Sequence, residues 1–240
     1  MRMTKPVAVV TGGNTGIGRA VSVALAEAGF HVGICYVTEE QAAKDLACEI
    51  SGVAVYVDVS DEASVKDGVR QIQEQLGSPE VLVNNAGIQE RVPFLEMTTE
   101  QFDRMLAVNT RGAFLMMKAV VPAMMNGQCG RIINIASQTA LLGRSEMVHY
   151  TASKGALISM TKSLARELAP YGILVNCVAP GPVTSGPALS SVKERTAYMA
   201  SIPLQRFAAP EEVADTVRFL AVSGDYFTGQ VLSPNGGEVM

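Results

Sequence analysis

Three side chains near the middle of the chain could act together on a carbonyl group: Ser137, Tyr150 and Lys154. Tyr150 and Lys154 are four residues apart in the helix-forming segment 148–169, so they share one face of the predicted helix. Ser137 follows the apolar run 131–135, which is typical of a buried strand. A tyrosine titrates at about pH 10, and a nearby ammonium favours its phenolate. The three residues therefore predict general acid–base chemistry, with Ser137 as a second donor to the carbonyl oxygen.

A Tyr-x-x-x-Lys pair alone occurs by chance on many helices, but here a glycine-rich loop accompanies it. The apolar run Val7–Val10 leads into Thr11–Gly18, and an alanine-rich helix then runs to about Ala28. Glycines let the backbone approach a phosphate, and the helix N-terminus presents free N–H groups. The loop residues expected at a dinucleotide are Thr11, Gly12, Asn14, Thr15, Gly16, Ile17 and Gly18.

The end of the second predicted strand, Val32–Val37, is where a dinucleotide fold contacts the adenosine ribose. Tyr36 and Val37 stand there, and neither a carboxylate nor an arginine is present. Thr38–Gln41 has capping-box spacing, so Glu39 and Glu40 are best interpreted as residues of a first helical turn. Alternatively, one of these two glutamates reaches the ribose and repels a 2′-phosphate, which would favour NAD.

Two further predicted strands end in polar residues. Asp58 and Val59 follow Val53–Val57, and Asp58 either caps the helix that begins near Glu62 or accepts a hydrogen bond from an adenine amino group. Asn84–Gly87 follows Val81–Val83, and these residues suit both turn chemistry and a cofactor cleft.

The helix predicted from Thr98 to about Val121 contains an asparagine, Asn109, among apolar residues. A buried amide needs hydrogen-bond partners, so Asn109 is either a satisfied core group or part of a polar relay behind Lys154. After the helix that carries Tyr150, the strand Leu174–Val178 ends in the stiff turn Pro180–Thr184.

Residues from about 185 to 209 show little periodicity and are predicted to form a lid over the substrate. A last helix, Pro210–Ala221, and a last strand, Gln230–Ser233, complete the chain. Strands and helices alternate throughout, with no linker or repeat. We therefore expect one domain over residues 1–240, an α/β Rossmann-type fold with a doubly wound parallel sheet and helices on both faces.

Composition excludes several classes of protein. The chain has 240 residues, of which 48% are hydrophobic, and a net charge of −4, which gives no general attraction to nucleic acid or anionic membrane. No apolar run approaches the roughly 18 residues of a membrane span, and the first ten residues leave no room for a signal peptide. The four cysteines form no C-x-x-C pair and are expected to be small buried residues in a reducing cytoplasm, and with only two histidines no metal site is expected.

These motifs together resemble the short-chain dehydrogenase/reductase family along essentially the whole chain. The matching residues are Thr11-Gly12-x-x-x-Gly16-x-Gly18, Asn84–Gly87, Asn109, Ser137, Tyr150-x-x-x-Lys154 and Pro180-Gly181. The resemblance implies that Tyr150 is the general acid/base, that Ser137 orients the carbonyl, that Lys154 depresses the tyrosine pKa and holds the nicotinamide ribose, and that Asn109 anchors a water of the proton relay. It also implies cofactor contacts for Tyr36, Asp58, Val59, Asn85, Ala86, Gly87, Pro180, Gly181, Val183 and Thr184, and a homotetramer.

Within the family, the chain is similar to the 3-oxoacyl carrier-protein reductases, which implies a ketone or secondary alcohol substrate held as a thioester. It lacks the basic residues that such reductases often carry near Asn126–Cys129 and Ala169–Tyr171, where an acidic carrier would dock. Absence of the NAD-type aspartate favours NADP, although the basic residue of NADP users is also missing at Thr15 and Val37. The alternative is an NAD-dependent sugar or polyol dehydrogenase.

Overall fold

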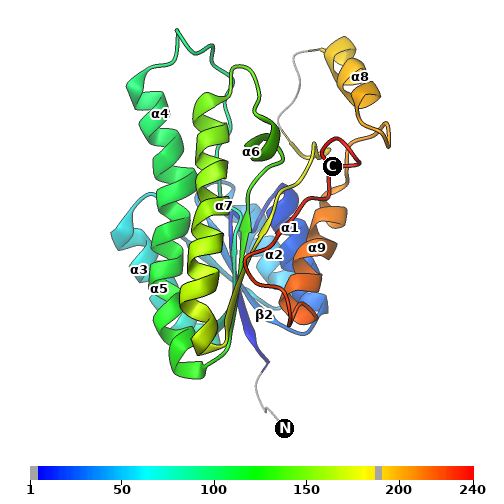
Figure 1. Cartoon of the computed structure of the whole chain (residues 1–240). Coiled ribbons are helices and arrows are strands. Elements are labelled where there is room, and N and C mark those ends of the chain that lie inside the picture. The colour runs from blue at the N-terminus through cyan, green and yellow to red at the C-terminus, as the bar shows by residue number, and fades with distance from the viewer. Residues whose placement is uncertain (1–4, 187–190) are drawn as a thin grey trace.

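The computed structural model describes residues 5–186 and 191–240, which form one seven-stranded parallel sheet covered by helices (Figure 1). The strand order is β3-β2-β1-β4-β5-β6-β7. The strands are β1 (Val7–Thr11), β2 (His31–Tyr36), β3 (Val53–Tyr56), β4 (Pro79–Asn84), β5 (Gly130–Ile135), β6 (Ile173–Val178) and β7 (Val231–Leu232). The doubly wound α/β fold predicted from the sequence is confirmed.

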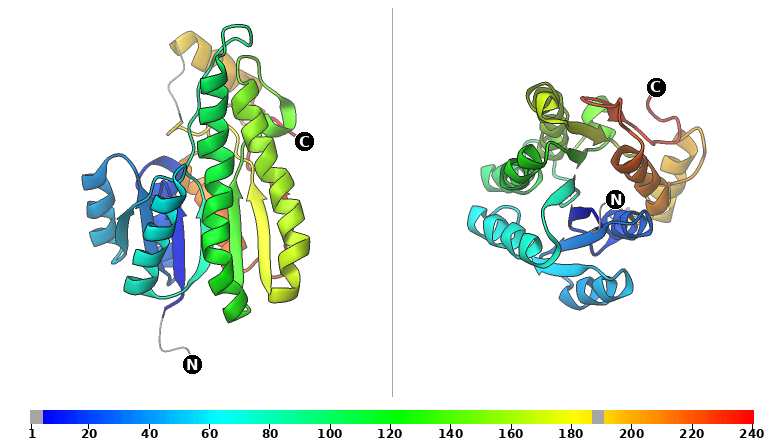
Figure 2. Two further views of the ribbon diagram at one scale, coloured as in Figure 1. Left: turned by 90° about the vertical axis from the view of Figure 1, so that its left-hand side faces the viewer. Right: turned by 90° about the horizontal axis from the view of Figure 1, so that it is seen from below.

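Helices cover both faces of this sheet (Figure 2). The helices α1 (Gly16–Glu27), α2 (Glu40–Glu49) and α9 (Pro210–Val222) lie on one face, and α3 (Glu62–Leu76), α5 (Gly112–Gly127) and α7 (Val148–Leu168) lie on the other. The shorter helices are α4 (Thr99–Leu106), α6 (Thr139–Leu142) and α8 (Val192–Ser201), with a π-helical turn η1 (Ala107–Arg111) and a 3-10 turn η2 (Ala169–Tyr171).

The central strands are apolar on both sides because helices cover both faces of a parallel sheet. All five residues of β1 are buried, and alternate side chains enter different cores: Val9 joins the one under α3, α5 and α7, and Val10 joins the one under α1 and α9. Burial of this kind stabilises the fold by about 1.5–3 kcal/mol for each large side chain. None of the helices in the described ranges is long and apolar enough to cross a membrane.

The predicted helix from Thr98 to Val121 is in fact interrupted. Thr98 forms the expected capping box with Gln101, but α4 ends at Leu106 and η1 separates it from α5, which runs on to Gly127 through Pro122. A π-helical turn inserts one extra residue into the helix, and such turns concentrate at functional sites. Here the extra residue rotates Asn109 inward, where it is 1% exposed.

Two predicted helix caps are wrong. Thr38 does not cap α2: Glu39 occupies the cap position with φ +56°, and no side chain accepts a hydrogen bond from the first turn. Asp58 does not cap α3 either, because Asp61 accepts from the amide of Ala63 in that role. Asp58 instead accepts from the amide and hydroxyl of Ser60, an Asx turn that holds the segment after β3 at the edge of the cleft.

The cysteine prediction is half right. Cys35 and Cys177 are buried in strands, and burial raises the pKa of each thiol to about 12. Cys48 is exposed and Cys129 is half-buried. Cys48 points outward because it lies on the solvent face of α2, opposite the buried Ala43, Leu46 and Ala47.

The strand order reverses between β1 and β4: β2 and β3 are added on one side of β1, and β4 to β7 are added on the other side. Ligands of doubly wound folds bind in the crevice at such a reversal. The glycine loop after β1 and the turn after β4 meet here, and Gly18 of α1 lies against the Gly12 backbone and the Asn85 side chain. A Cβ atom at Gly18 would overlap the carbonyl oxygen of Gly12 and lie 2.6 Å from Nδ2 of Asn85.

Replacing Gly18 by Ala should therefore weaken both the fold and the cofactor site. We expect Gly18→Ala to lower the free energy of unfolding by at least about 2 kcal/mol, the scale of an overpacked contact, and to raise the cofactor Kd at least about tenfold. Gly127→Ala is the matched control, because no atom of the described residues outside its own helical turn lies within 4 Å of the added methyl group. Thermal unfolding and cofactor titration check both variants, and a Gly18→Ala protein as stable and as tightly binding as the control would contradict the close approach.

Candidate active site

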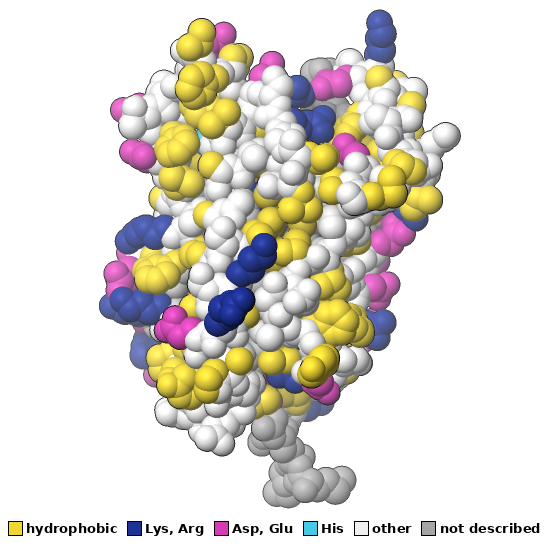
Figure 3. Space-filling view, in the orientation of Figure 1, with side chains coloured by type: hydrophobic (Ala, Val, Ile, Leu, Met, Phe, Trp, Pro, Cys, Tyr) yellow, Lys and Arg dark blue, Asp and Glu magenta, His cyan; other side chains and the backbone are white. Residues whose placement is uncertain are grey.

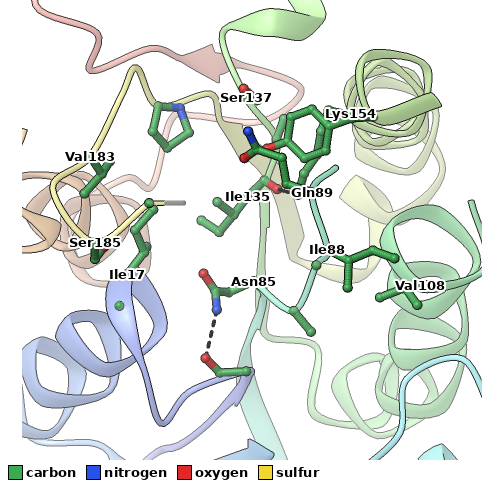
Figure 4. A pocket seen from close by; sticks show the side chains of 18 of the residues that line it. Ile17, Asn85, Ile88, Gln89, Val108, Ile135, Ser137, Lys154, Val183 and Ser185 are labelled. Atoms are coloured by element: carbon green, nitrogen blue, oxygen red, sulfur yellow. Dashed lines mark hydrogen bonds between the residues drawn. The ribbon is translucent and has the colours of Figure 1, made fainter. Parts of the chain in front are cut away.

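A cavity of about 780 Å³ opens at the carboxyl ends of the strands, over the reversal between β1 and β4. Ligand sites of this kind commonly measure several hundred Å³. Figure 4 shows Ile17, Val183 and Ser185 on one side of the cavity, and Ser137 and Lys154 on another, with Asn85 between them. Segments from both halves of the fold therefore contribute to one site.

The glycine loop ends in a helix N-terminus that faces this cavity. The first helical hydrogen bond of α1 runs from the amide of Arg19 to the carbonyl of Thr15, so the amides of Gly16, Ile17 and Gly18 have no partner within the helix. No acidic side chain stands in the first turn, and the side chain of Thr15 does not cap it. The helix dipole and these free N–H groups form an anion site that fits the pyrophosphate of a nicotinamide dinucleotide.

Asn85 and Thr11 tie the loop to the turn after β4. The amide Nδ2 of Asn85 donates to the carbonyl oxygens of Thr11 and Gly12 at 3.0 Å each, and one such bond is drawn in Figure 4. In return, Oγ1 of Thr11 accepts from the backbone amides of Asn85 and Ala86 at 3.0 Å. These four bonds fix the floor of the cavity on both sides of the reversal.

Ser137 and Tyr150 meet at the substrate side of the cavity. Ser137 lies just after β5, where Oγ accepts from the backbone amide of Thr139 at 3.2 Å and from its hydroxyl at 3.0 Å. Since two donors already point at Oγ, the proton of Ser137 is directed elsewhere, and it bonds to the phenolic oxygen of Tyr150. The pair therefore presents two O–H groups that can converge on one substrate oxygen.

Lys154 does not lower the pKa of Tyr150 in the way expected from the sequence. Burial raises the pKa of the phenol, and only the hydrogen bond from Ser137 opposes that effect. The ammonium of Lys154 lies 5.8 Å from the centre of the tyrosine ring and donates to the carbonyl oxygen of Ile135 at 2.8 Å. Burial also lowers the pKa of Lys154 to about 8. The phenol is thus held in its protonated form, which suits a proton donor.

Asn109 lies behind Lys154 rather than in the cavity wall. Its Oδ1 accepts from the amide of Ile88 at 2.8 Å, and its Nδ2 donates to the carbonyl of Ile88 at 2.9 Å and to Oγ of Ser153 at 3.0 Å. A Cβ atom at Gly87 would lie 3.1 Å from Oδ1 of Asn109 and 3.4 Å from Nζ of Lys154. Asn109 is therefore a satisfied core amide that also fixes the turn against which Lys154 rests.

The cavity gathers most of the residues predicted from the sequence. The predicted residues that line it are Gly12, Asn14, Thr15, Gly16, Ile17, Tyr36, Asp58, Val59, Asn85, Ala86, Gly87, Ser137, Tyr150, Lys154, Pro180, Gly181 and Val183. Thr11, Gly18, Asn109 and Thr184 do not line it. Thr11, Gly18 and Asn109 support the wall from behind, whereas Thr184 is exposed and its amide donates to the carbonyl of Ala208.

Sequence reasoning missed the group that closes the substrate end. Gln138 Nε2 donates to a carboxylate oxygen of Glu238 at 2.6 Å, and that same oxygen accepts from the Tyr198 hydroxyl at 3.3 Å. The guanidinium of Arg144 stacks on the Tyr198 ring at 4.3 Å. Tyr198 and Glu238 come from α8 and the C-terminal segment, so no local pattern could place them beside Ser137.

The segment predicted as a lid contributes Ser185, Gly186, Tyr198 and Phe207 to the lining, while residues 187–190 lie outside the described residues. It contains the helix α8, which its weak periodicity did not reveal. Arg91 holds α8 to the mouth of the cavity, because it pairs with Glu194 of that helix at 2.7 Å and with Glu146 at 3.0 Å.

Comparison with known proteins agrees with this geometry. The sequence model of a family described as enoyl-(acyl carrier protein) reductase matches residues 12–238. The chain belongs to the short-chain dehydrogenase/reductase family. It is 39% identical to the 3-oxoacyl-[acyl-carrier-protein] reductase FabG of Staphylococcus aureus over the full length of both chains. It is 37% identical to the 3-oxoacyl-[acyl-carrier-protein] reductase of Synechocystis sp., and the match covers 99% of this chain and 98% of that one. It is also 37% identical to FabG of Salmonella typhimurium, over 98% and 97% of the two chains.

Membership identifies the protein as an NAD(P)-dependent oxidoreductase that acts on CH–OH groups. A nicotinamide cofactor supplies or accepts the hydride in such an enzyme. The free amides of α1 and the glycines of the loop fit its phosphates, as described above, and the cavity extends from there to Tyr150.

The buried ammonium of Lys154 should cost stability near neutral pH. A pKa of about 8 in the folded chain against the ordinary 10.5 corresponds to about 3 kcal/mol. We expect Lys154→Met to be more stable than the wild type at pH 7, by about 1–2 kcal/mol once the lost bond to Ile135 is deducted, and to be inactive.

This advantage should shrink as the pH rises from about 8 to about 10.5, because over that range the unfolded chain keeps a proton that the folded wild type has lost. Denaturant titrations of both proteins at pH 7 and pH 9.5 measure the difference. A gap that does not change with pH, or a variant less stable than the wild type at pH 7, would show that the ammonium is not strained by burial.

Proposed function

We propose that the protein reduces the ketone of a 3-oxoacyl thioester to the secondary alcohol, with NADPH as the reductant. The single observation that carries this proposal is the hydrogen-bonded pair Ser137 and Tyr150, which faces a cavity whose opposite wall is a phosphate-binding helix N-terminus. The names of the relatives, 3-oxoacyl-[acyl-carrier-protein] reductases, support the substrate class.

In the proposed reaction, the hydroxyls of Ser137 and Tyr150 both donate to the carbonyl oxygen. The reduced nicotinamide, when bound, supplies the hydride to the carbonyl carbon. As that carbon accepts the electron pair, negative charge develops on the oxygen, and the proton of Tyr150 passes to it to give the alcohol. Burial raises the pKa of Tyr150, so the phenol carries the proton that this step requires at neutral pH.

Lys154 and Asn109 support this step from behind. We assign Lys154 to the nicotinamide ribose and to recharging Tyr150 with a proton, and Asn109 to positioning the turn at Gly87 that borders both. Charge on the buried ammonium becomes more favourable when negative charge forms nearby, so Lys154 also assists the phenolate that remains after proton transfer. The cofactor phosphates are assigned to Gly12–Gly18, and the adenosine half to Tyr36, Asp58, Val59 and Asn85–Gly87.

A second candidate is an NAD-linked sugar or polyol dehydrogenase. The observation in its favour is the polar substrate end, where Gln138, Arg144 and Tyr198 line the cavity. Such side chains can bond to hydroxyl groups, whereas an acyl chain makes no use of them. The catalytic step would be the same in either case.

The surface supports a homotetramer. Phe114 of α5 and Val148 of α7 are 46% and 43% exposed, and a separate set, Phe219, Val222 and Tyr226, lies on α9 and the loop after it. Figure 3 shows hydrophobic side chains at the surface on both flanks of the molecule. Two distinct apolar faces generate a tetramer when each pairs with its own copy about a twofold axis.

We also infer a cytoplasmic location, which the four free thiols support, and we propose no nucleic-acid partner.

The function is tested by following NADPH oxidation with acetoacetyl-CoA, ethyl acetoacetate and oxidised sugars. We expect acetoacetyl-CoA to give the highest kcat/KM, and Tyr150→Phe to lose at least about 10³-fold of it while its cofactor Kd stays within about twofold. Wild-type turnover of sugars alone would favour the second candidate. A Tyr150→Phe protein that remains active would refute the proposed chemistry.

The tetramer is tested by light scattering of the native protein. We expect a mass about four times that of the 25.4 kDa chain, and a fall to dimers when Phe114→Glu places a charge in one apolar face. Glu100→Lys on α4, an exposed change of charge, serves as control. A wild-type protein that runs as a monomer would contradict the proposal.

A further inference from the structure

The adenosine end of the cavity lies over β1 and β2, where a dinucleotide fold holds the ribose of its cofactor. This ribose pocket is lined by Asn14, Thr15, Tyr36, Val37 and Thr38. All five are uncharged at neutral pH. In such folds a carboxylate here bonds the 2′-hydroxyl of NAD, and an arginine here accommodates the 2′-phosphate of NADP. The pocket contains neither of these two groups.

Asp58, which follows the neighbouring strand β3, also lines the cavity, and its carboxylate accepts hydrogen bonds from the amide and hydroxyl of Ser60. The two glutamates that follow β2 do not add a free charge to the ribose pocket. Glu40 pairs with Lys44 at 2.6 Å and bonds the phenol of Tyr36, and these contacts lower the pKa of Glu40. Its charge is therefore matched by an ammonium on the same helix. Glu39 occupies the cap position of α2 and does not line the cavity. The predicted alternative, a glutamate that reaches the ribose, has no support in the lining.

The cations that line the described part of the cavity belong to other walls. Arg91 is paired with two glutamates, Arg144 stacks on Tyr198, and Lys154 lies beneath Tyr150. Arg104 lies one helical turn before Val108, which Figure 4 shows across the cavity from Ile17. Arg19 is close to the loop in sequence, but it pairs with Glu49 at 2.8 Å and does not line the cavity.

The neutral pocket is also held in place. Nδ2 of Asn14 donates to the carbonyl of Thr38 at 2.9 Å, which joins the glycine loop to the turn after β2. Asn14 is 6% exposed, so this contact is shielded from water. The remaining groups that a ribose or its phosphate could meet are the hydroxyls of Thr15 and Thr38 and backbone amides. Such donors can bond a hydroxyl or a phosphate oxygen, and they favour neither through charge.

We infer that the enzyme uses both NADPH and NADH, with dissociation constants within about tenfold of each other, or about 1.4 kcal/mol. The 2′-phosphate of NADPH gains no ion pair at the edge of this pocket, where it remains hydrated. The 2′-hydroxyl of NADH binds without leaving a charged side chain of the pocket unpaired. The claim that both cofactors support turnover rests on the proposed function, whereas the claim that both bind does not. Binding is a property of the pocket alone.

The test is a fluorescence titration of each reduced cofactor in the absence of substrate, at about 50 and about 300 mM NaCl. We expect the ratio of the two Kd values to lie between about 0.1 and 10 and to change less than about threefold with salt, since no exposed ion pair is screened. A ratio outside this range in either direction overturns the inference, and so does a ratio that changes more than about threefold with salt.

Two substitutions probe the pocket directly. Thr15→Arg should shift the Kd ratio at least about tenfold toward NADPH and make it sensitive to salt, while Val37→Asp should shift it toward NADH. Gln75→Arg is the control, because it adds the same charge near the end of α3, at the amino end of the sheet. If neither variant changes the ratio, the ribose does not lie where we place it. A protein that binds both cofactors but reduces no ketone leaves this inference standing and removes the proposed function.

Discussion

Hydrogen bonds of Thr11 with Asn85 and Ala86 join the glycine loop after β1 to the turn after β4, at the point where the strand order reverses. The carboxyl ends of β1 and β4 carry backbone groups that no neighbouring strand can satisfy there, and one asparagine and one threonine satisfy them. The same contact brings Gly12 against the turn after β4, which leaves no space for a side chain at Gly18. The phosphate end and the catalytic end of the cavity are therefore parts of one rigid floor. Without it, the hydride donor and Tyr150 would have no fixed relation to each other.

Burial dominates the electrostatics at the catalytic end. Loss of contact with water displaces both Tyr150 and Lys154 toward their neutral forms: the phenol holds its proton more firmly, and the ammonium loses its proton more easily. The pair is thus set for a change of charge rather than for a standing ion pair. When the phenol gives up its proton, the phenolate and the ammonium stabilise each other in a medium of low dielectric constant, where that attraction is strongest. Burial of Lys154 therefore lowers the stability of the resting protein, but it strengthens the attraction between the ammonium and the phenolate once the proton has been transferred.

Local patterns in the sequence were enough to predict the sheet, the glycine loop and the residues Ser137, Tyr150 and Lys154, because each depends on spacing within one or two elements. The failures involve alternatives of nearly equal local energy. Thr38 and Asp58 are both chemically fit to cap a helix, but tertiary contacts select Glu39 and Asp61 for those positions. The π-helical turn at Asn109 adds a single residue to an otherwise continuous helix, which leaves the apolar pattern almost unchanged. The group formed by Gln138, Tyr198 and Glu238 joins residues 60 and 100 positions apart, and no local pattern reveals it.

Different kinds of side-chain contact shape the ribose end and the substrate end of the cavity. At the ribose end, Asn14 is used internally and the remaining side chains are neutral, so the pocket is defined by shape and by hydroxyl donors. At the substrate end, the acceptor Glu238 receives bonds from both Gln138 and Tyr198, so α8, the C-terminal segment and the turn after Ser137 are joined through one carboxylate. The oxygen Oε1 of Gln138 is buried and has no partner in residues 5–186 and 191–240, although this side chain adjoins Ser137. An unpaired buried acceptor costs about 1–3 kcal/mol, and a donor that reached it would recover this energy. The Gln138 amide is thus only half satisfied, because its nitrogen bonds Glu238 while its oxygen has no partner among the described residues.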